Sequence, residues 1–359
     1  MTDLQTEPPR RAWYEPLLDR GILPDRWVRA GIRRRLAGRL REESQGNAAE
    51  REHRRSEFAA ELAQRPIAIA TAAANEQHYE LPPDFFRLVL GPRLKYSCTF
   101  WPTGTASLAA SEDAMLELTA ERAQLADGQR VLDLGCGWGS LTFWVLEHCP
   151  RSQVVAVSNS AVQREFIEGQ ARQRGFDDRL EVRTADANHL QLEQRFDRIV
   201  SIEMFEHMKN YRSLLARLAG MLQADGKLFV HVFSHREHAY DFEVEGDWIG
   251  RYFFTGGTMP SHDLLPRFQE HVTLEDAWEL DGTHYERTAN AWLAQLDAER
   301  AAVLDVLARA YGEIEAPRWL QRWRVFFMAC AELWGFAGGS EWQVSHYRFA
   351  PAASASRSG

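Results

Sequence analysis

The stretch VLDLGCGWG at residues 131–139 decides the fold class, because an apolar strand here runs into a glycine-rich turn that opens a helix. The strand passes through Asp133, and Gly135, Gly137 and Gly139 follow at alternating positions. Glycine has no Cβ, so the backbone at such a turn can approach a ligand closely. The stretch predicts a ligand-binding loop at the end of a buried strand; a tight turn without a ligand is the alternative.

Two details disfavour a nicotinamide dinucleotide as that ligand. The glycine spacing is GxGxG, whereas dinucleotide-binding loops have GxGxxG. The next predicted strand, QVVAVSNS, ends in Ser158 and Asn159, where a dinucleotide site carries an acid for the ribose. Asp133 beside the loop also fits a cofactor that carries an ammonium and a sulfonium.

Strands and helices alternate from about residue 116 onward. Apolar strands joined by helices predict a doubly wound α/β fold, with a mostly parallel seven-stranded sheet covered on both faces. Ligands in such sheets bind beyond the carboxyl ends of the strands. The predicted strands cover residues 130–137, 153–160, 180–187, 196–203, 227–233, 271–280 and 342–350.

We predict four regions along the chain. Residues 1–115 form an N-terminal helical region that covers the cofactor and substrate site, and residues 116–235 form the cofactor-binding core. Residues 236–350 hold an aromatic, glycine-rich insertion over the active site (236–268), the last two strands and, between them, a helical substrate cap (289–337). Residues 351–359, PAASASRSG, are expected to be a disordered tail.

Composition and charge exclude several classes of protein. The net charge of −9 over 359 residues argues against general affinity for nucleic acid. No apolar run is long enough to span a bilayer, and the N-terminus is too polar for a secretory signal, so we expect a cytoplasmic protein. The four cysteines show no CxxC pairing, and His231, His235 and His238 lack a completing acid or cysteine. We therefore expect neither disulfides nor a metal site.

An arginine-rich segment, RWVRAGIRRRLAGRLREE at residues 26–43, predicts a basic helix near the N-terminus. Such a helix can contact anionic lipid or a partner protein, and contact with lipid would make the chain a peripheral membrane protein. The alternative is a solvated helix face, which the acidic residues that follow closely favour.

Four segments together resemble a known family. They are NEQHYELPPDFFRLVLGPRLKYSC (75–98), VLDLGCGWGSL (131–141), SIEMFEHMKNY (201–211) and RYFFTGGTMPS (251–261). The chain resembles the cyclopropane fatty acid synthase superfamily of methyltransferases, and within it is most similar to the coclaurine N-methyltransferase family. The resemblance implies a class I, Rossmann-like methyltransferase that uses S-adenosylmethionine. It also implies a small-molecule amine acceptor, with a tetrahydroisoquinoline-like cyclic amine as the type, and a homodimer.

The resemblance also places the cofactor site. The KYS segment matches residues that wrap S-adenosylmethionine, the glycine loop matches the family's loop, and later positions match those that hold the ribose, methionine and adenine parts. With Asp133, the predicted cofactor-binding residues are Tyr96, Ser97, Asp133, Gly135, Gly137, Ser158, Asn159, Gln163, Asp186, Ala187 and Ile202.

Three titratable residues, Glu203, Glu206 and His207, follow the fourth predicted strand within five positions. A protonated amine has no lone pair, so it must lose a proton to a nearby base before it can attack a methyl group. The histidine imidazole titrates near neutrality and suits that task. The resemblance implies that His207 is the general base, helped by Glu206, and that Glu203 orients the amine. A helix-start cluster of acids is the structural alternative.

Aromatic residues are expected to form the acceptor pocket, because a ring stacked on a cationic amine gains a cation–π interaction. Plain core packing is nearly as good an account of Trp323 and Phe326, which lie on a predicted helix with an apolar stripe. From the resemblance, the predicted substrate-binding residues are Tyr79, Glu80, His231, Phe233, Trp323 and Phe326.

Two alternatives stay open at this point. In the cyclopropane synthases the acceptor is a lipid alkene, and a bicarbonate ion held around positions matching Cys98, Glu206 and His231 takes the proton. The acid at Glu203 favours the amine branch, as do the phenylalanines of WRVFFMAC, where the synthases supply a tyrosine. The second alternative is a non-catalytic module that keeps the fold, which the intact glycine loop, Glu206 and His207 disfavour.

Overall fold

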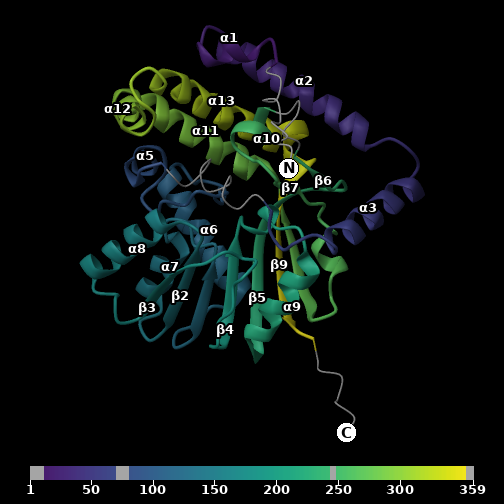
Figure 1. Cartoon of the computed structure of the whole chain (residues 1–359), viewed down its shortest axis with the longest axis vertical. Coiled ribbons are helices and arrows are strands. Elements are labelled where there is room, and N and C mark those ends of the chain that lie inside the picture. The colour runs from purple at the N-terminus through teal and green to yellow at the C-terminus, as the bar shows by residue number, and fades with distance from the viewer. Residues whose placement is uncertain (1–11, 70–80, 243–247, 353–359) are drawn as a thin grey trace, which may run out of the picture.

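The computed structural model describes residues 12–69, 81–242 and 248–352. Its centre is one seven-stranded sheet in the order β3-β2-β1-β4-β5-β9-β8 (Figure 1). The first five strands in this order are parallel, and β9 runs antiparallel to both β5 and β8. This order confirms the predicted class I methyltransferase fold. The strands are β1 (Arg130–Leu134), β2 (Gln153–Ser158), β3 (Leu180–Thr184), β4 (Phe196–Ile202), β5 (Leu222–His235), β8 (Val272–Leu280) and β9 (Trp342–Pro351).

Both faces of the central strands are buried, which explains why these strands are apolar throughout rather than alternating. Val131 and Val154 pack against the helices α6 (Leu108–Ala123), α7 (Ser140–His148) and α8 (Ala161–Arg174). Their neighbours Leu132 and Val155 point to the other face and pack with α9 (Tyr211–Met221). Only the edge strand β8 alternates buried and open positions.

A helical layer lies across the carboxyl ends of the parallel strands, at the top of the view in Figure 1. It packs around a third apolar core that is rich in aromatic side chains, Trp292, Trp323 and Phe327 among them. The helices of this layer are α1 (Glu15–Asp19), α2 (Asp25–Glu43), α5 (Pro83–Val89), α10 (Trp248–Tyr252), α11 (Thr283–Ala298), α12 (Arg300–Tyr311) and α13 (Ala316–Trp334).

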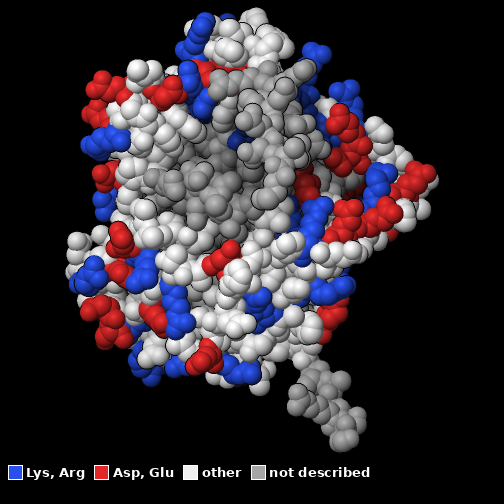
Figure 2. Space-filling model, viewed as in Figure 1, with Lys and Arg blue, Asp and Glu red and all other residues white. Residues whose placement is uncertain are grey.

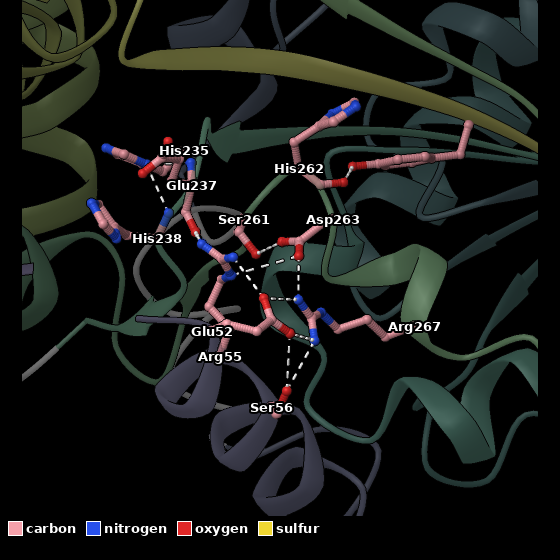
Figure 3. A network of polar contacts seen from close by, with 11 residues as sticks. Glu52, Arg55, Ser56, His235, Glu237, His238, Ser261, His262, Asp263 and Arg267 are labelled. Atoms are coloured by element: carbon pink, nitrogen blue, oxygen red, sulfur yellow. Dashed lines mark hydrogen bonds and ion pairs between the residues drawn. The ribbon is translucent and has the colours of Figure 1, made fainter. Parts of the chain in front are cut away.

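The helix α3 (Ala48–Leu62) is fastened to the side of the sheet by charged side chains (Figure 3). Glu52 accepts hydrogen bonds from Arg267 at 2.8 and 3.0 Å and from Arg55 at 2.6 Å. Arg267 also bonds Asp263, whose carboxylate accepts from Ser261 at 2.7 Å. The network therefore ties the N-terminal helices to the segment that leads into β8.

Residues 236–268, predicted as an insertion, contain a two-stranded sheet of β6 (Tyr240–Asp241) and β7 (Thr258–Met259), with α10 between them. A short 3-10 helix, η2 (Leu265–Arg267), follows. The buried Lys209 joins this sheet to the core, because its ammonium donates to Asp241 and Thr258 at 2.5 Å each.

Membrane-spanning helices, disulfides and a basic surface are not expected from the sequence. No helix in the described ranges is long and apolar enough to cross a membrane. The four cysteines lie as free thiols. On the face shown in Figure 2, basic and acidic side chains alternate across the described surface without a continuous basic region.

The clearest differences from the predicted boundaries concern β5 and the helical region before β9; β1 and β3 also end three residues earlier than predicted. The strand β5 begins at Leu222, five residues before the predicted start at residue 227, because it continues through Gln223-Ala-Asp-Gly226. A Cβ at Gly226 would lie 3.0 Å from the Phe196 carbonyl oxygen, so this part of β5 approaches β4 closely. The helical region predicted at 289–337 is three helices, of which the first begins at Thr283. Pro351, predicted to begin the disordered tail, is the last residue of β9, and from position 353 onward the tail lies outside the described residues.

Candidate active site

The glycine loop leaves β1 and folds back onto β2, as the sequence predicts for a ligand-binding turn. The N–H groups of Gly135 and Cys136 both donate to the Val157 carbonyl, at 2.9 and 3.0 Å. Gly135 and Gly137 have φ of +82° and +52°, conformations that L side chains rarely adopt. A Cβ on Gly135 would lie 2.9 Å from the Met204 side chain, whereas a Cβ on Gly137 would meet no protein atom within 4 Å. The loop therefore packs against Met204 at Gly135 and faces open space at Gly137.

A cavity of about 830 Å³ opens in front of this loop, and we name it the glycine-loop cavity. It lies beyond the carboxyl ends of the strands, where open α/β sheets bind their ligands. Seven predicted cofactor residues line it, namely Gly135, Gly137, Ser158, Asn159, Gln163, Asp186 and Ala187.

A second cavity of about 530 Å³ continues behind the loop and shares Gly135, Gly137 and Gln163 with the first. We name it the Asp133 cavity. The remaining predicted cofactor residues line it, namely Tyr96, Ser97, Asp133 and Ile202. The structure therefore brings all the predicted cofactor residues to two neighbouring cavities that share lining residues.

The polar groups of this space suit S-adenosylmethionine. The Gln163 side chain is buried, and its oxygen accepts from the Ser158 hydroxyl at 2.6 Å. Its Nε2 has no hydrogen-bond partner among the described residues, so it can donate to a ligand. Asp133 is buried beside Thr142, whose hydroxyl donates to it at 2.7 Å, and burial raises the pKa of Asp133 to about 6. Its carboxylate form would attract a ligand ammonium.

A third cavity, of about 720 Å³, lies on the other side of Glu203, and we name it the aromatic cavity. Rings form most of its wall, and Glu206 and His207 supply polar groups. Its aromatic residues are Tyr96, Phe233, Phe242, Phe254, Tyr285, Trp292, Phe326 and Trp334.

Glu203 borders all three cavities and is held at that position by its surroundings. It follows the carboxyl end of β4 with φ of +45°, a strained conformation for a residue with a side chain. Its Oε1 accepts from the Cys98 N–H at 2.7 Å, and its Oε2 accepts from the Tyr285 hydroxyl at 2.6 Å. Burial raises the pKa of Glu203, and the nearby Lys95 charge and the Tyr285 hydrogen bond oppose that rise.

Glu206 and His207 lie on the 3-10 helix η1 (Phe205–His207) directly after Glu203. Glu206 is 1% exposed, and its Oε2 has no hydrogen-bond partner among the described residues. Burial, followed by the negative charge of Glu203, raises the pKa of Glu206 well above its usual range. His207 borders both the glycine-loop cavity and the aromatic cavity, and its ring contacts Phe254 with 4.7 Å between centroids.

The predicted substrate residues divide into three groups. Phe233 and Phe326 line the aromatic cavity. Trp323 is fully buried between Phe85 and Phe253 instead, with ring centroids 4.7 and 5.0 Å away, so it belongs to the core. His231 is also fully buried; its Nε2 lies 3.3 Å from Oε1 of Glu203, behind the carboxylate rather than at a cavity wall. Tyr79 and Glu80 lie outside the described residues.

The sequence does not identify several residues that the structure brings to the site. Tyr285, Trp292, Cys330 and Trp334 line the aromatic cavity from α11 and α13. A helical pattern shows that these residues are apolar and periodic, but it does not show which turn of a long buried helix faces a cavity. Lys95 is 2% exposed, and its ammonium donates to Ser97 and to the Cys98 carbonyl. A lysine within the apolar stretch LKYSC was the available signal.

Comparisons with known proteins agree with this geometry. The family model described as mycolic acid cyclopropane synthetase matches residues 68–339. The (S)-coclaurine N-methyltransferase of Thalictrum flavum subsp. glaucum is 37% identical over 338 residues, which cover 92% of this chain and 93% of that protein. The cyclopropane-fatty-acyl-phospholipid synthase of Escherichia coli is 32% identical over 272 residues, covering 75% of this chain and 66% of that protein.

Among solved structures, coclaurine N-methyltransferase bound to N-methylheliamine and SAH superposes with a TM-score of 0.91. It is 35% identical and covers 94% of this chain and 98% of the other. The family match spans most of the chain, and the sheet order and site geometry agree with it. The chain therefore belongs to the mycolic acid cyclopropane synthetase family of S-adenosylmethionine-dependent methyltransferases, and within it resembles the coclaurine N-methyltransferases.

Proposed function

We propose that the protein transfers the methyl group of S-adenosylmethionine to the amine nitrogen of a small molecule. One observation carries this proposal: Glu203 and His207 each border both the glycine-loop cavity and the aromatic cavity. A methyl donor in the first cavity and an acceptor in the second would therefore meet beside a carboxylate and an imidazole. When bound, S-adenosylmethionine supplies a methyl group that is already electrophilic, so the protein's task is alignment and proton removal.

The acceptor cavity suits a cationic amine on an aromatic framework. Tyr285 and Trp334 stack with their rings 3° from parallel, and Phe233 and Phe254 add further faces. Such faces attract a cation, and the Glu203 carboxylate adds an opposite charge at the mouth of the cavity. The relatives named above include a coclaurine N-methyltransferase and a structure of such an enzyme bound to N-methylheliamine, and we propose a tetrahydroisoquinoline-like amine as the acceptor class.

Three residues divide the work in this proposal. Glu203 attracts and orients the ammonium form of the acceptor. His207 removes the ammonium proton and so exposes the lone pair that attacks the methyl group. Glu206 assists, because burial raises its pKa and makes its carboxylate form a stronger base than an exposed glutamate. The proposed cofactor residues orient the donor from the glycine-loop and Asp133 cavities.

The lipid alternative has one point in its favour and one against. The E. coli synthase is 32% identical, and the family resemblance matches Cys98, Glu206 and His231 to bicarbonate positions. In the structure, however, Oε1 of Glu203 is hydrogen-bonded to both the Cys98 N–H and Nε2 of His231. A bicarbonate ion at this place would meet a second negative charge, which favours the amine reaction.

We also propose a homodimer, a cytoplasmic location and a peripheral contact of α2 with anionic membranes. Exposed Trp27 and the arginines of α2 support the membrane contact. Arg29 and Arg33, however, form ion pairs with Glu332 of α13 at 2.9 and 2.5 Å. These two arginines therefore hold α2 against α13. Sedimentation of the purified protein alone, and with vesicles containing 0 or about 30% phosphatidylserine, tests the dimer and the contact separately.

The function itself is tested by incubating the protein with S-adenosylmethionine and a panel of cyclic secondary and tertiary amines, followed by mass spectrometry. We expect a gain of one methyl group on at least one amine. The Glu206→Gln variant, which keeps the side-chain shape, should bind the cofactor and methylate the same amine far more slowly. Binding of the cofactor with no methylated amine in the panel, while other acceptors are methylated, would contradict the proposal.

A further inference from the structure

Four side chains, three from different elements and one from the loop after β4, form a continuous row behind the active site. Arg122 on α6 lies with Nη1 2.8 Å from Nδ1 of His346 on β9. Nε2 of His346 lies 2.9 Å from Nδ1 of His231 on β5, its partner in the strand register. Nε2 of His231 lies 3.3 Å from Oε1 of Glu203. Both histidines have no exposed surface, so the row is enclosed between α6 and the sheet.

The direction of every hydrogen bond in this row follows from its first member. A guanidinium can only donate, so Nδ1 of His346 must be an acceptor and its proton must lie on Nε2. That N–H donates to Nδ1 of His231, so the second imidazole also carries its proton on Nε2 and donates it toward Glu203. Burial lowers the pKa of both histidines well below the usual range, so each is neutral with one donor and one acceptor.

This direction excludes a proton wire. A wire must release at one end the proton that it takes up at the other, and an arginine does not release its proton in proteins. The row instead has a fixed polarity that ends at a carboxylate. Oε1 of Glu203 then accepts from both Cys98 and His231, while Tyr285 occupies Oε2. Three donors from three directions fix the plane of the carboxylate in a residue whose backbone is already strained.

We infer that Arg122, His346 and His231 are positioning residues that hold the Glu203 carboxylate as an oriented acceptor for the substrate ammonium. This inference rests on the proposed amine methylation for its functional part. Its structural part, the fixed tautomers of two buried histidines, does not depend on any substrate. His231 accordingly acts through Glu203 and does not touch the acceptor.

Arg122 is the residue at which the inference is best tested, because it borders none of the three cavities. It is half-buried on α6, with its guanidinium 5.0 Å from the centre of the Trp278 ring. Arg122→Met keeps the apolar stem and removes the donor, and Arg122→Lys restores a donor. A matched control is Arg198→Met, which removes a half-buried guanidinium that donates to the Gln124 carbonyl at the end of the same helix.

The kinetic experiment compares the methylation rates of these variants and of the unaltered protein, with an amine that the unaltered protein methylates as substrate. We expect Arg122→Met to lower kcat/KM for the amine by about tenfold, as for loss of orientation by one hydrogen-bonded support, with cofactor affinity unchanged. Arg122→Lys should recover most of that loss, and Arg198→Met should stay within about twofold of the unaltered protein. Equal rates for Arg122→Met and Arg198→Met would overturn the inference, and so would equal losses for Arg122→Met and Arg122→Lys.

A second measurement keeps the inference testable if Arg122→Met does not fold. Nitrogen NMR of the ¹⁵N-histidine-labelled protein reports the tautomer of each imidazole, with His231→Gln and His346→Gln used only to assign signals. We expect both histidines to be neutral with the proton on Nε2. A proton on Nδ1 of either, or a charged ring near neutral pH, would overturn the inference. Correct tautomers without any amine methylation would leave the hydrogen-bond row intact and refute the proposed function instead.

Discussion

The Tyr285 hydroxyl donates a 2.6 Å hydrogen bond to Oε2 of Glu203 while its ring stacks on Trp334, 4.8 Å away and 3° from parallel. One side chain therefore both builds the wall of the aromatic cavity and fixes the carboxylate at its mouth. Burial and the Glu203 charge raise the pKa of Tyr285 well above its usual range, so the hydroxyl remains a donor at physiological pH. The position of Glu203 thus depends on the helical layer, through Tyr285 of α11, as well as on the sheet.

Removing the Tyr285 hydroxyl separates these two tasks. Tyr285→Phe keeps the stacked ring and should lower kcat/KM for the amine by about tenfold to a hundredfold, the usual value of a hydrogen bond to a charged group. Cofactor affinity measured by calorimetry should not change. Tyr347→Phe is the control, because it removes an equally buried hydroxyl that donates to the His262 carbonyl away from the cavities. Equal losses in the two variants would assign Tyr285 to stability alone.

Replacing the proposed bases should slow turnover without loss of the cofactor. Glu206→Gln and His207→Ala should each lower kcat by about a hundredfold or more, the range for lost general base catalysis. The control is Glu15→Gln, which neutralises a carboxylate of similar burial that bonds Arg251. If calorimetry shows that either base variant no longer binds S-adenosylmethionine, its assignment to catalysis is wrong.

The raised pKa of Glu206 also predicts a pH dependence. A carboxyl group accepts a proton only when ionised, and burial together with the Glu203 charge shifts that ionisation to higher pH. The amine kcat/KM of the unaltered protein should therefore rise with pH, and part of that rise should disappear in Glu206→Gln. Rate profiles from pH 5.5 to 9 at saturating cofactor test this, and identical profiles for the two proteins would contradict a role for Glu206 ionisation.

Asp133 predicts a separate pH dependence for cofactor binding. Its pKa of about 6 means that the carboxylate is largely ionised at pH 7.5 and largely protonated at pH 5. Because only the ionised form attracts an ammonium, we expect S-adenosylmethionine to bind about tenfold more weakly at pH 5 than at pH 7.5. In Asp133→Asn, binding should be weak at both values. Affinity that falls equally in the two proteins would show that another group controls it.

Gly137 tests where the cofactor lies. A Cβ there would meet no protein atom within 4 Å, so a larger side chain would project into the glycine-loop and Asp133 cavities. Gly137→Val should abolish the thermal shift caused by S-adenosylmethionine. Gly175→Val is the matched control, because Gly175 has φ of +69°, equally open surroundings and a place at the end of α8 away from the cavities. A shift that persists in Gly137→Val would place the cofactor elsewhere.

The sequence predicts the sheet well because strand pattern is a local property. All seven strands of the sheet lie where apolar runs predict them, and the glycine loop follows the first. The β5 start differs because β5 pairs with β4 at Leu222 and again from Lys227, across an irregularity that looks like a turn in the sequence. The cofactor residues come from loops at strand ends, and topology alone gathers these loops at one edge of the sheet.

The acceptor site is harder to predict because it depends on how long helices rotate against the sheet. Trp323 and Phe326 are three residues apart on α13, yet Phe326 faces the aromatic cavity and Trp323 faces Phe85. Tyr285 reaches Glu203 across 82 residues of sequence, a contact that no local pattern encodes. His231 stands next to Glu203 in space, but only the register of β5 with β9 shows that it continues to His346.

The central claim is tested most directly by competition for one methyl donor. The protein is incubated with S-adenosylmethionine carrying a deuterated methyl group, a cyclic secondary amine and vesicles of unsaturated phospholipid together, and mass spectrometry follows the label. We predict labelled amine and unlabelled lipid, with the amine label strongly reduced in Glu206→Gln. Labelled lipid beside an unlabelled amine would contradict the account and assign the enzyme to the cyclopropane-forming branch of its family.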